Sequence, residues 1–241
     1  MKKHPIWSGL VIMSVWCMVS IGALAERYEQ ELSLVGVLEP TKISGFSGTK
    51  YRVGVPDSQG DEYALYGITS EERRDNPCYV TVRTENINDS GKALDLKKDL
   101  CGGKQTSSTI AAEYSNSKYD KRVFVTGAAV CMNNDNTRVK GIKIRGKKLG
   151  EDGGLIDLQE SVVPENKSGM PAYNTSPTSM PTDVRAHCND NWKKWAQCPD
   201  AHIATAAILH YEAGKEPRSL TGLELECRRA ALPGTGAVRA E

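Results

Sequence analysis

The chain contains 241 residues, with 31 lysines and arginines against 30 aspartates and glutamates, so its formal net charge is +1. This balance lacks the basic excess that is typical of general nucleic-acid-binding proteins, so no nucleic-acid partner is expected. Hydrophobic residues make up 39% of the chain and charged residues 25%, which is typical of a folded globular protein and argues against disorder along the whole chain.

Residues 1–25 have the pattern of a secretory signal peptide of bacterial style. Two lysines precede an apolar stretch, and an Ala-Leu-Ala sequence places the cleavage after Ala25. Cleavage also removes Cys17, which leaves 7 − 1 = 6 cysteines and a net charge of 29 − 30 = −1. No later apolar run reaches the roughly 18 residues of a membrane span. We therefore expect an exported protein, periplasmic or extracellular, with no transmembrane segment in its mature chain.

The next part of the chain, residues 26–156, is predicted to form a β domain. Residues 26–36 fit either a short helix or an opening strand. Beyond them, short runs rich in Val, Ile, Thr and Tyr are separated by turn-forming residues, which indicates a succession of strands. The clearest predicted strands are residues 51–55, 79–84, 122–126 and 142–145.

The remainder of the chain divides into three further segments. Residues 157–186 are rich in Pro, Ser and Thr and are predicted to be a linker or a long surface loop, because they have little apolar surface to offset the entropy of ordering. A cysteine-rich β unit is predicted at 187–230, followed by a flexible tail at 231–241. Within this tail, an LPxTG-like sequence lacks the apolar stretch that a cell-wall anchoring signal needs.

An internal repeat is the strongest signal in the sequence. The segment 125–131 aligns with 204–210, and 139–144 aligns with 220–225, so that Gly141 matches Gly222. A fainter copy ends in Leu-Tyr-Gly-Ile, where Gly67 is taken as the counterpart of Gly141. Copies at nearly constant spacing indicate duplicated supersecondary units, of which 187–230 contains the third.

The repeat also predicts the local structure of each unit. Apolar and charged residues alternate after each glycine, as in a strand with one face buried. The alternation shifts by one place across the glycine, which predicts a β-bulge and therefore a strand, a polar loop and a bulged strand. The charges of the outer face change from Lys143 and Arg145 to Glu224 and Glu226, so this face is not a charged binding surface shared by the copies. The expected fold class is mainly β, with short antiparallel strands in duplicated hairpins that form a β-prism, sandwich or barrel.

The repeat resembles that of the vitelline-membrane-outer-layer proteins. The resemblance lies in Ala-Thr-Ala-Ala-Ile at 204–208 and in Leu-Thr-Gly-Leu-Glu-Leu-Glu-Cys at 220–227. It implies a three-fold β-prism, and prisms of this and of the lectin kind often bind carbohydrate. The earlier copy departs from the pattern, because Gly146 stands in the place of Cys227, and no binding residues can be transferred.

Six cysteines in an exported chain predict a framework of three disulfides. Cys78 and Cys101 flank a predicted hairpin and are expected to pair. Cys227 is expected to pair with Cys188 or Cys198, and the remaining cysteine of those two is expected to reach Cys131.

The loop from Cys188 to Cys198 is the candidate ligand-binding site. It contains both tryptophans of the mature chain, Trp192 and Trp195, with Lys193 and Lys194 between them. Indole rings suit sugar rings and membrane interfaces, and lysines suit acidic glycans or lipid phosphates. The alternative is that the tryptophans cap the small core of this unit while the lysines are solvated.

No motif for a catalytic, metal or cofactor site is present, and no catalytic residues, metal or cofactor are predicted. The segment Asn133–Asn136 offers oxygens for calcium, but a polar hairpin turn is the favoured interpretation. The mature chain contains three histidines, which a hydrolase would have to gather with carboxylates: His187, His202 and His210.

These observations favour an exported, non-catalytic protein that binds glycan or another cell-surface component. The alternative is an envelope or secreted protein with a protein partner, such as an adhesin component, an inhibitor or an assembly subunit, with 157–186 as its docking arm. A hydrolase with a site assembled from scattered residues is the third hypothesis.

Overall fold

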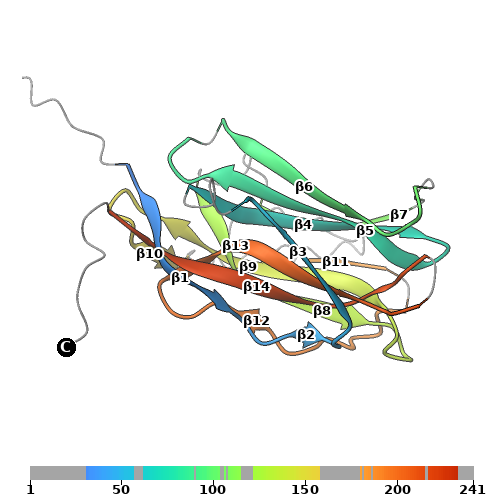
Figure 1. Ribbon diagram of the computed structural model, residues 1–241. Helices are drawn as coiled ribbons and strands as arrows, with labels where there is room; N and C mark the ends of the chain where they lie inside the picture. Colours follow the sequence, from blue (N-terminus) through green and yellow to red (C-terminus); the bar gives the residue numbers. More distant parts are fainter. Residues whose placement is uncertain are drawn as a thin grey trace, which may run out of the picture.

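The computed structural model describes residues 31–56, 62–89, 91–103, 106, 108–114, 122–157, 180, 182–185, 187–214 and 217–232. The predicted signal peptide, most of the predicted 157–186 segment and the tail beyond Leu232 lie outside these residues. All regular elements in the described part of the chain are β-strands (Figure 1). No helix there is long and apolar enough to cross a membrane.

The strands form three antiparallel sheets, which we name A, B and C. Sheet A contains β1 (Ser33–Pro40), β2 (Ser44–Gly45), β3 (Thr49–Gly54), β13 (His202–Tyr211) and β14 (Leu220–Ala231). Sheet B contains β4 (Tyr63–Arg73), β5 (Asn76–Asn86), β6 (Ala93–Asp99) and β7 (Ser108–Glu113). Sheet C contains β8 (Val123–Met132), β9 (Val139–Leu149), β10 (Leu155–Asp157), β11 (Thr182–Val184) and β12 (Ala196–Gln197).

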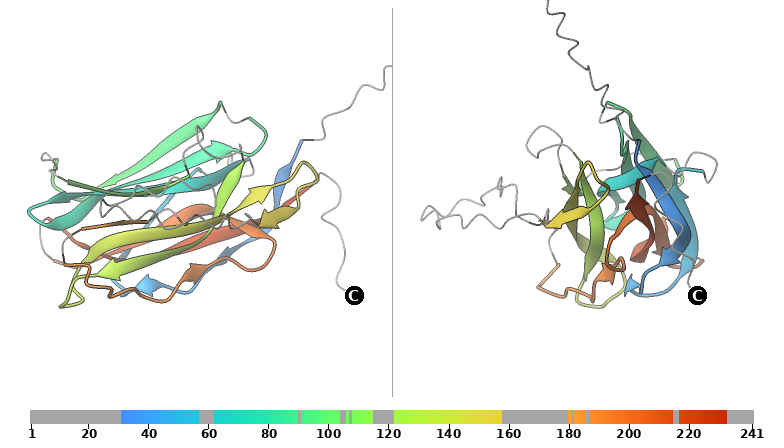
Figure 2. Two further views of the ribbon diagram at one scale, coloured as in Figure 1. Left: turned by 180° about the vertical axis from the view of Figure 1, so that it is seen from behind. Right: turned by 90° about the vertical axis from the view of Figure 1, so that its left-hand side faces the viewer.

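Each sheet is built on one long hairpin: β4–β5, β8–β9 or β13–β14. The three sheets surround a common interior, which the end-on view of Figure 2 shows. One hydrophobic cluster fills this interior with side chains from all three hairpins, such as Val80, Ile142 and Leu223. The predicted fold class is therefore confirmed, and three sheets around one core correspond to the prism among the three architectures predicted.

The predicted glycine-associated bulges are present in both clear copies of the repeat. In β9 the extra residue is Lys140, immediately before Gly141, and in β14 it is Thr221, immediately before Gly222. A one-residue insertion reverses the direction of the following side chains, so Ile142 and Leu223 face the core. The copies also share a bulge in their first strands, at Thr126 and Thr205.

The alignment of the faint third copy was wrong. Gly67 lies in β4, the first strand of its hairpin, directly after the bulged residue Tyr66. Its counterpart is thus Gly127, which follows the bulged residue Thr126, and not Gly141. In sheet C, both β8 and β9 have a glycine directly after the bulged residue. A match to a single glycine therefore could not show which of the two strands Gly67 corresponds to.

One segment left open between helix and strand contributes to a strand. Residues 33–36 of the opening segment belong to β1, which pairs with β14, and the first strand predicted for the third repeat copy is β13, between β14 and β3. Residues 182–184, within the predicted linker or loop, form β11 against β9. The cysteine-rich segment contributes strands to two sheets, since β12 pairs with β8 of sheet C.

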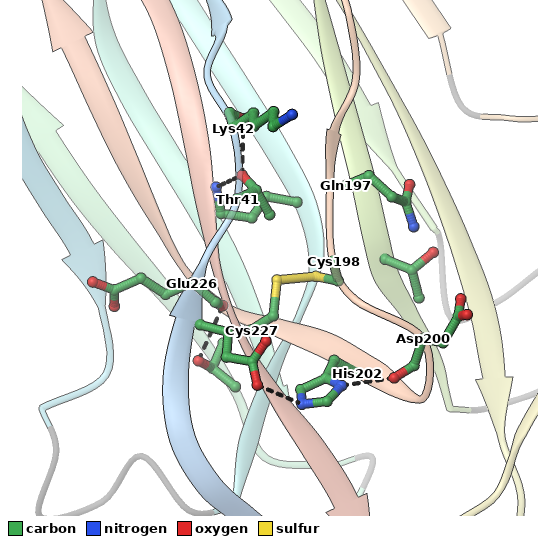
Figure 3. Close-up of a disulfide and its surroundings, with 12 residues drawn as sticks. Thr41, Lys42, Gln197, Cys198, Asp200, His202, Glu226 and Cys227 are labelled. Atoms are coloured by element: carbon green, nitrogen blue, oxygen red, sulfur yellow. Dashed lines mark hydrogen bonds and ion pairs between the residues drawn. A yellow bond between two sulfur atoms is a disulfide. The ribbon is translucent and has the colours of Figure 1, made fainter.

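The expected Cys78–Cys101 disulfide is present, and of the two alternatives left open for the other four cysteines the structure has Cys131–Cys188 and Cys198–Cys227. The first closes the β5–β6 hairpin. The other two hold both ends of the 188–198 segment, one to β8 and one to β14. Figure 3 shows the Cys198–Cys227 bridge.

Candidate functional site

The segment that contains the two tryptophans lies along the free edge of β8. The amide of Met132 donates a hydrogen bond to the carbonyl of Asn191 at 3.0 Å, and the amide of Lys193 donates to the carbonyl of Val130 at 2.9 Å. Further along, β12 pairs with β8 through Ala196 and Ala128. The segment is therefore an interrupted edge strand whose position is fixed by backbone hydrogen bonds and by a disulfide at each end.

Trp192 and Trp195 lie on the outer face of sheet C. Trp192 forms an isolated bridge with Cys131, so these two residues share one face of sheet C. Cys131 also pairs with Gly141, and this position lies on the face opposite the core residues. Ala196 belongs to the hydrophobic core, and side chains alternate along a strand, so the neighbouring Trp195 points outward. Both tryptophans are half-buried, and neither belongs to the two core clusters of the described residues.

Two cations from β9 lie against these indole rings. Ile142 and Ile144 face the core, so Lys143 and Arg145 extend over the outer face. The Lys143 Nζ atom lies 4.2 Å from the centre of the Trp192 ring and 5.3 Å from that of Trp195. The Arg145 guanidinium carbon lies 4.5 Å from the centre of the Trp195 ring. These are cation–π distances, at which the ring face attracts the positive charge.

Small residues of β8 let these long side chains cross the sheet. Gly127 is paired with Arg145, and Ala129 is paired with Lys143. A methyl group at Gly127 would collide with the side chains of Arg145 and Gln197. The sequence therefore places small residues where side chains from both neighbouring strands meet.

The Arg145 guanidinium is partly withdrawn from water. Its Nε donates a hydrogen bond to the Gln197 side-chain oxygen, which comes from β12 on the other side of β8. Burial lowers the pKa of Arg145 from its usual value, because burial disfavours the charged form. Arginine nevertheless stays protonated at physiological pH, so the face carries a fixed positive charge.

A third aromatic ring extends the same surface toward sheet A. Phe46 is 43% exposed, and the Lys193 Nζ atom lies 5.2 Å from its ring centre. Phe46 follows β2, which is held by the hydrogen bond from the Val130 amide to the Ser44 hydroxyl at 3.0 Å. Gly45 permits this approach, since its φ is 98° and a Cβ there would collide with the carbonyl of Thr221.

The asparagine-rich turn holds Lys193 in place. Its ammonium donates hydrogen bonds to the side-chain oxygens of Asn136 at 2.6 Å and Asn191 at 2.8 Å. The Asn133 side-chain oxygen accepts the amides of Thr137 and Arg138. The side-chain oxygens of Asn133 and Asn136 in this turn therefore accept hydrogen bonds from the protein itself.

We call this surface the aromatic–cationic face. It comprises Phe46, Lys143, Arg145, Trp192, Lys193, Lys194 and Trp195, of which Phe46 and Lys194 are exposed. The structure brings three of the four candidate binding residues of the sequence analysis together through these contacts, and the exposed Lys194 lies beside them in the same segment. It adds Phe46, Lys143 and Arg145, which were missed. The alternation of residues 142–145 indicated that Lys143 and Arg145 point outward, but nothing in it placed them beside the tryptophans.

The three histidines have separate surroundings. His210 is buried, accepts the Gly48 amide at Nδ1 (3.2 Å) and donates from Nε2 to Glu224 at 2.7 Å. His202 contacts the Asp200 carbonyl at 2.7 Å (Figure 3), and His187 is exposed. In the described part of the chain, no three His, Cys, Asp or Glu side chains gather as metal ligands.

A scan against protein-family models and a search of curated proteins both found no match. Among solved structures, the chain is similar to Calystegia sepium agglutinin, with a TM-score of 0.43 and 9% identity over 81% of this chain and 99% of that one. It is also similar to Calsepa lectin in complex with a bisected glycan, with a TM-score of 0.42 and 10% identity over 81% of this chain and 100% of the other.

Proposed function

We propose that this protein is an exported, non-catalytic binding protein that recognises glycan through the aromatic–cationic face. The observation that carries the proposal is the pair of half-exposed tryptophans outside the core, with Lys143 against both of their rings. Indoles offer flat apolar surface beside a polar N–H group, which suits the alternating C–H and hydroxyl groups of a sugar.

The rigidity of the face supports the same function. Trp192 and Trp195 lie between Cys188 and Cys198, each of which is bound by a disulfide to a strand. A surface that is ordered before binding loses less conformational entropy when the ligand arrives. An edge segment fixed in this way therefore suits a preformed binding site.

The disulfides also support export. Three bridges connect all six cysteines that follow residue 25. Disulfides form and persist in oxidising compartments, such as the bacterial periplasm and the extracellular space. We therefore propose that the chain functions in one of these two compartments after removal of residues 1–25.

The double variant Trp192→Ala/Trp195→Ala is expected to lose glycan binding. The wild type is first screened on a glycan array and on immobilised polysaccharides, and the dissociation constants of its ligands are then measured. Removing two anchor rings should weaken binding by about tenfold or more. The matched control is Val37→Ala/Leu94→Ala, which shortens two exposed apolar side chains on sheets A and B and should leave binding unchanged.

Unchanged binding in the tryptophan variant would show that the aromatic–cationic face is not the glycan-binding site. If the wild type binds no glycan and instead co-purifies with a stoichiometric protein, a protein-binding function replaces the glycan-binding one. Tryptophan and arginine are also frequent anchors of protein interfaces, so this second outcome has a physical basis.

A further inference from the structure

The internal repeat allows the outer faces of the three sheets to be compared position by position. The count starts from the bulged residue in the second strand of each hairpin, which is Lys140 in sheet C, Thr221 in sheet A and Cys78 in sheet B. By this count, Lys143 corresponds to Glu224, and Arg145 corresponds to Glu226 and to Arg83. Each sheet therefore provides a reference for the others.

At these positions, the outward charges of sheets A and B form ion pairs within the protein. Glu224 pairs with Lys50 at 3.0 Å, and Glu226 pairs with Arg52 at 2.6 Å. On sheet B, Arg83 pairs with Glu113 at 2.6 Å and Asp95 at 3.8 Å. Only the Arg83–Asp95 pair joins adjacent strands, and the other three pairs each reach across one intervening strand, β13 in sheet A or β4 in sheet B.

Sheet C differs at the corresponding positions. Lys143 and Arg145 contact indole rings and an amide oxygen, and Lys193 contacts two asparagines and Phe46. Among the described residues, no carboxylate lies within ion-pair distance of these three cations or of Lys194. This face thus concentrates positive charge on a chain whose net charge is only +1.

An anionic ligand would supply the missing negative charge. Like charges held close together repel, and Arg145 loses part of its hydration, so an incoming carboxylate or sulfate would relieve both costs. An arginine can hold such a group with two parallel hydrogen bonds, and the lysines add unspecific attraction. The neighbouring indoles would contact the sugar ring that carries the acid.

We propose that the ligand of the aromatic–cationic face is an acidic glycan, whose carboxylate or sulfate groups bind Lys143, Arg145, Lys193 and Lys194 while its sugar rings pack on Trp192 and Trp195. This inference rests on the proposed glycan-binding function and specifies its ligand class. An anionic membrane fits less well, because the apolar surface of this face is limited to two half-buried indoles and one partly exposed phenyl ring, whereas interfacial insertion depends on a larger apolar area.

The test compares the full chain on sulfated, carboxylated and neutral polysaccharides of similar length, for example heparin, polygalacturonate and dextran. We expect at least one acidic polymer to bind about tenfold or more tightly than the neutral one. This binding should weaken strongly between roughly 50 and 300 mM salt, since salt screens charge. Lys143→Gln/Arg145→Gln should reduce the preference to near unity.

The matched control is Lys50→Gln/Arg52→Gln, which removes the same charge from sheet A. It should retain the acidic preference, because these cations are already paired with glutamates. An equal loss in this control would mean that net charge, and not the face, attracts the polymer, and would overturn the inference.

The remaining outcomes separate this inference from the proposed function. Equal binding of neutral and acidic polymers, lost in Trp192→Ala/Trp195→Ala, would overturn the acidic ligand and leave glycan binding intact. Absence of binding to every polysaccharide would overturn both. Binding confined to vesicles of anionic phospholipid, and lost in Lys143→Gln/Arg145→Gln, would replace the glycan with a membrane.

Discussion

Lys140→Ala is expected to lower the free energy of unfolding by about 3–5 kcal/mol. The Lys140 side chain is 1% exposed, and its ammonium lies 2.8 Å from the buried carboxylate of Glu72 on β4. It also donates hydrogen bonds to the carbonyl and the carboxylate of Asp75, in the turn between β4 and β5. Removing the lysine leaves the Glu72 charge buried without this partner. Urea denaturation measures the change.

Two further variants make this result specific. Lys97→Ala, on an exposed strand position of sheet B, should change stability by no more than about 0.5 kcal/mol. Lys140→Met/Glu72→Leu removes both charges and should be more stable than Lys140→Ala, because neither member of the buried pair is left without its partner. A loss below about 1 kcal/mol in Lys140→Ala would contradict a buried ion pair between sheets B and C.

The loss of stability in Lys140→Ala should depend on pH. Partial burial raises the pKa of Asp75, but the hydrogen bond and charge of Lys140, with Arg138 and His187, bring it below its usual value of 3.8. A carboxyl with a lowered folded-state pKa stabilises the fold above the unfolded-state pKa, and this stabilisation is lost as the pH falls through the folded-state pKa. The stability difference between wild type and Lys140→Ala should therefore shrink on acidification.

Removing the Cys131–Cys188 bridge is expected to cost about 4 kcal/mol in the chain-entropy treatment, because the bridged residues are 57 positions apart. Cys131→Ala/Cys188→Ala should also weaken glycan binding. Trp192 follows Cys188 by four residues and lies opposite Cys131 on β8, so the loss of the bridge releases the start of the tryptophan segment. Denaturation and binding are measured on the same preparation at a temperature where the variant is folded.

The Cys78–Cys101 bridge provides the matched control. These cysteines are 23 positions apart, so Cys78→Ala/Cys101→Ala should cost about 3 kcal/mol, a similar loss of stability. The bridge lies in sheet B, so the folded variant should bind glycan like the wild type. If both variants bind equally well, the Cys131–Cys188 bridge does not position the binding face.

The features predicted from sequence were those that short-range patterns determine. Alternation after Gly141 and Gly222 predicted the half-buried strands, and the change of phase predicted the bulges. The pairing of Cys78 with Cys101 followed from a hairpin whose turn lies midway between them. The residues that determine each of these features belong to one repeat unit or to directly consecutive strands.

The aromatic–cationic face was only half predictable, because it depends on contacts between distant segments. The expected bond from Cys188 or Cys198 to Cys131 brought one end of the segment near β8, but nothing in the sequence indicated that the segment adds to the edge of this strand, and this pairing is what places Trp192 beside Lys143. Phe46 reaches the face because β2 pairs with β14 and Ser44 accepts a hydrogen bond from the Val130 amide of β8. The burial of Lys140 could not be predicted for another reason. Lys140 lies in the bulge, where the alternation of residues does not indicate the direction in which a side chain points.

Intrinsic tryptophan fluorescence tests the central claim most directly. In the processed chain that we propose, without residues 1–25, the tryptophans are Trp192 and Trp195, so the emission comes from the aromatic–cationic face. In this chain, Trp192→Phe and Trp195→Phe each leave one reporter. Titration with the glycan bound by the wild type should change the emission of each reporter and reach saturation at the calorimetric dissociation constant. Calorimetric saturation with unchanged emission from both would show that the glycan binds elsewhere.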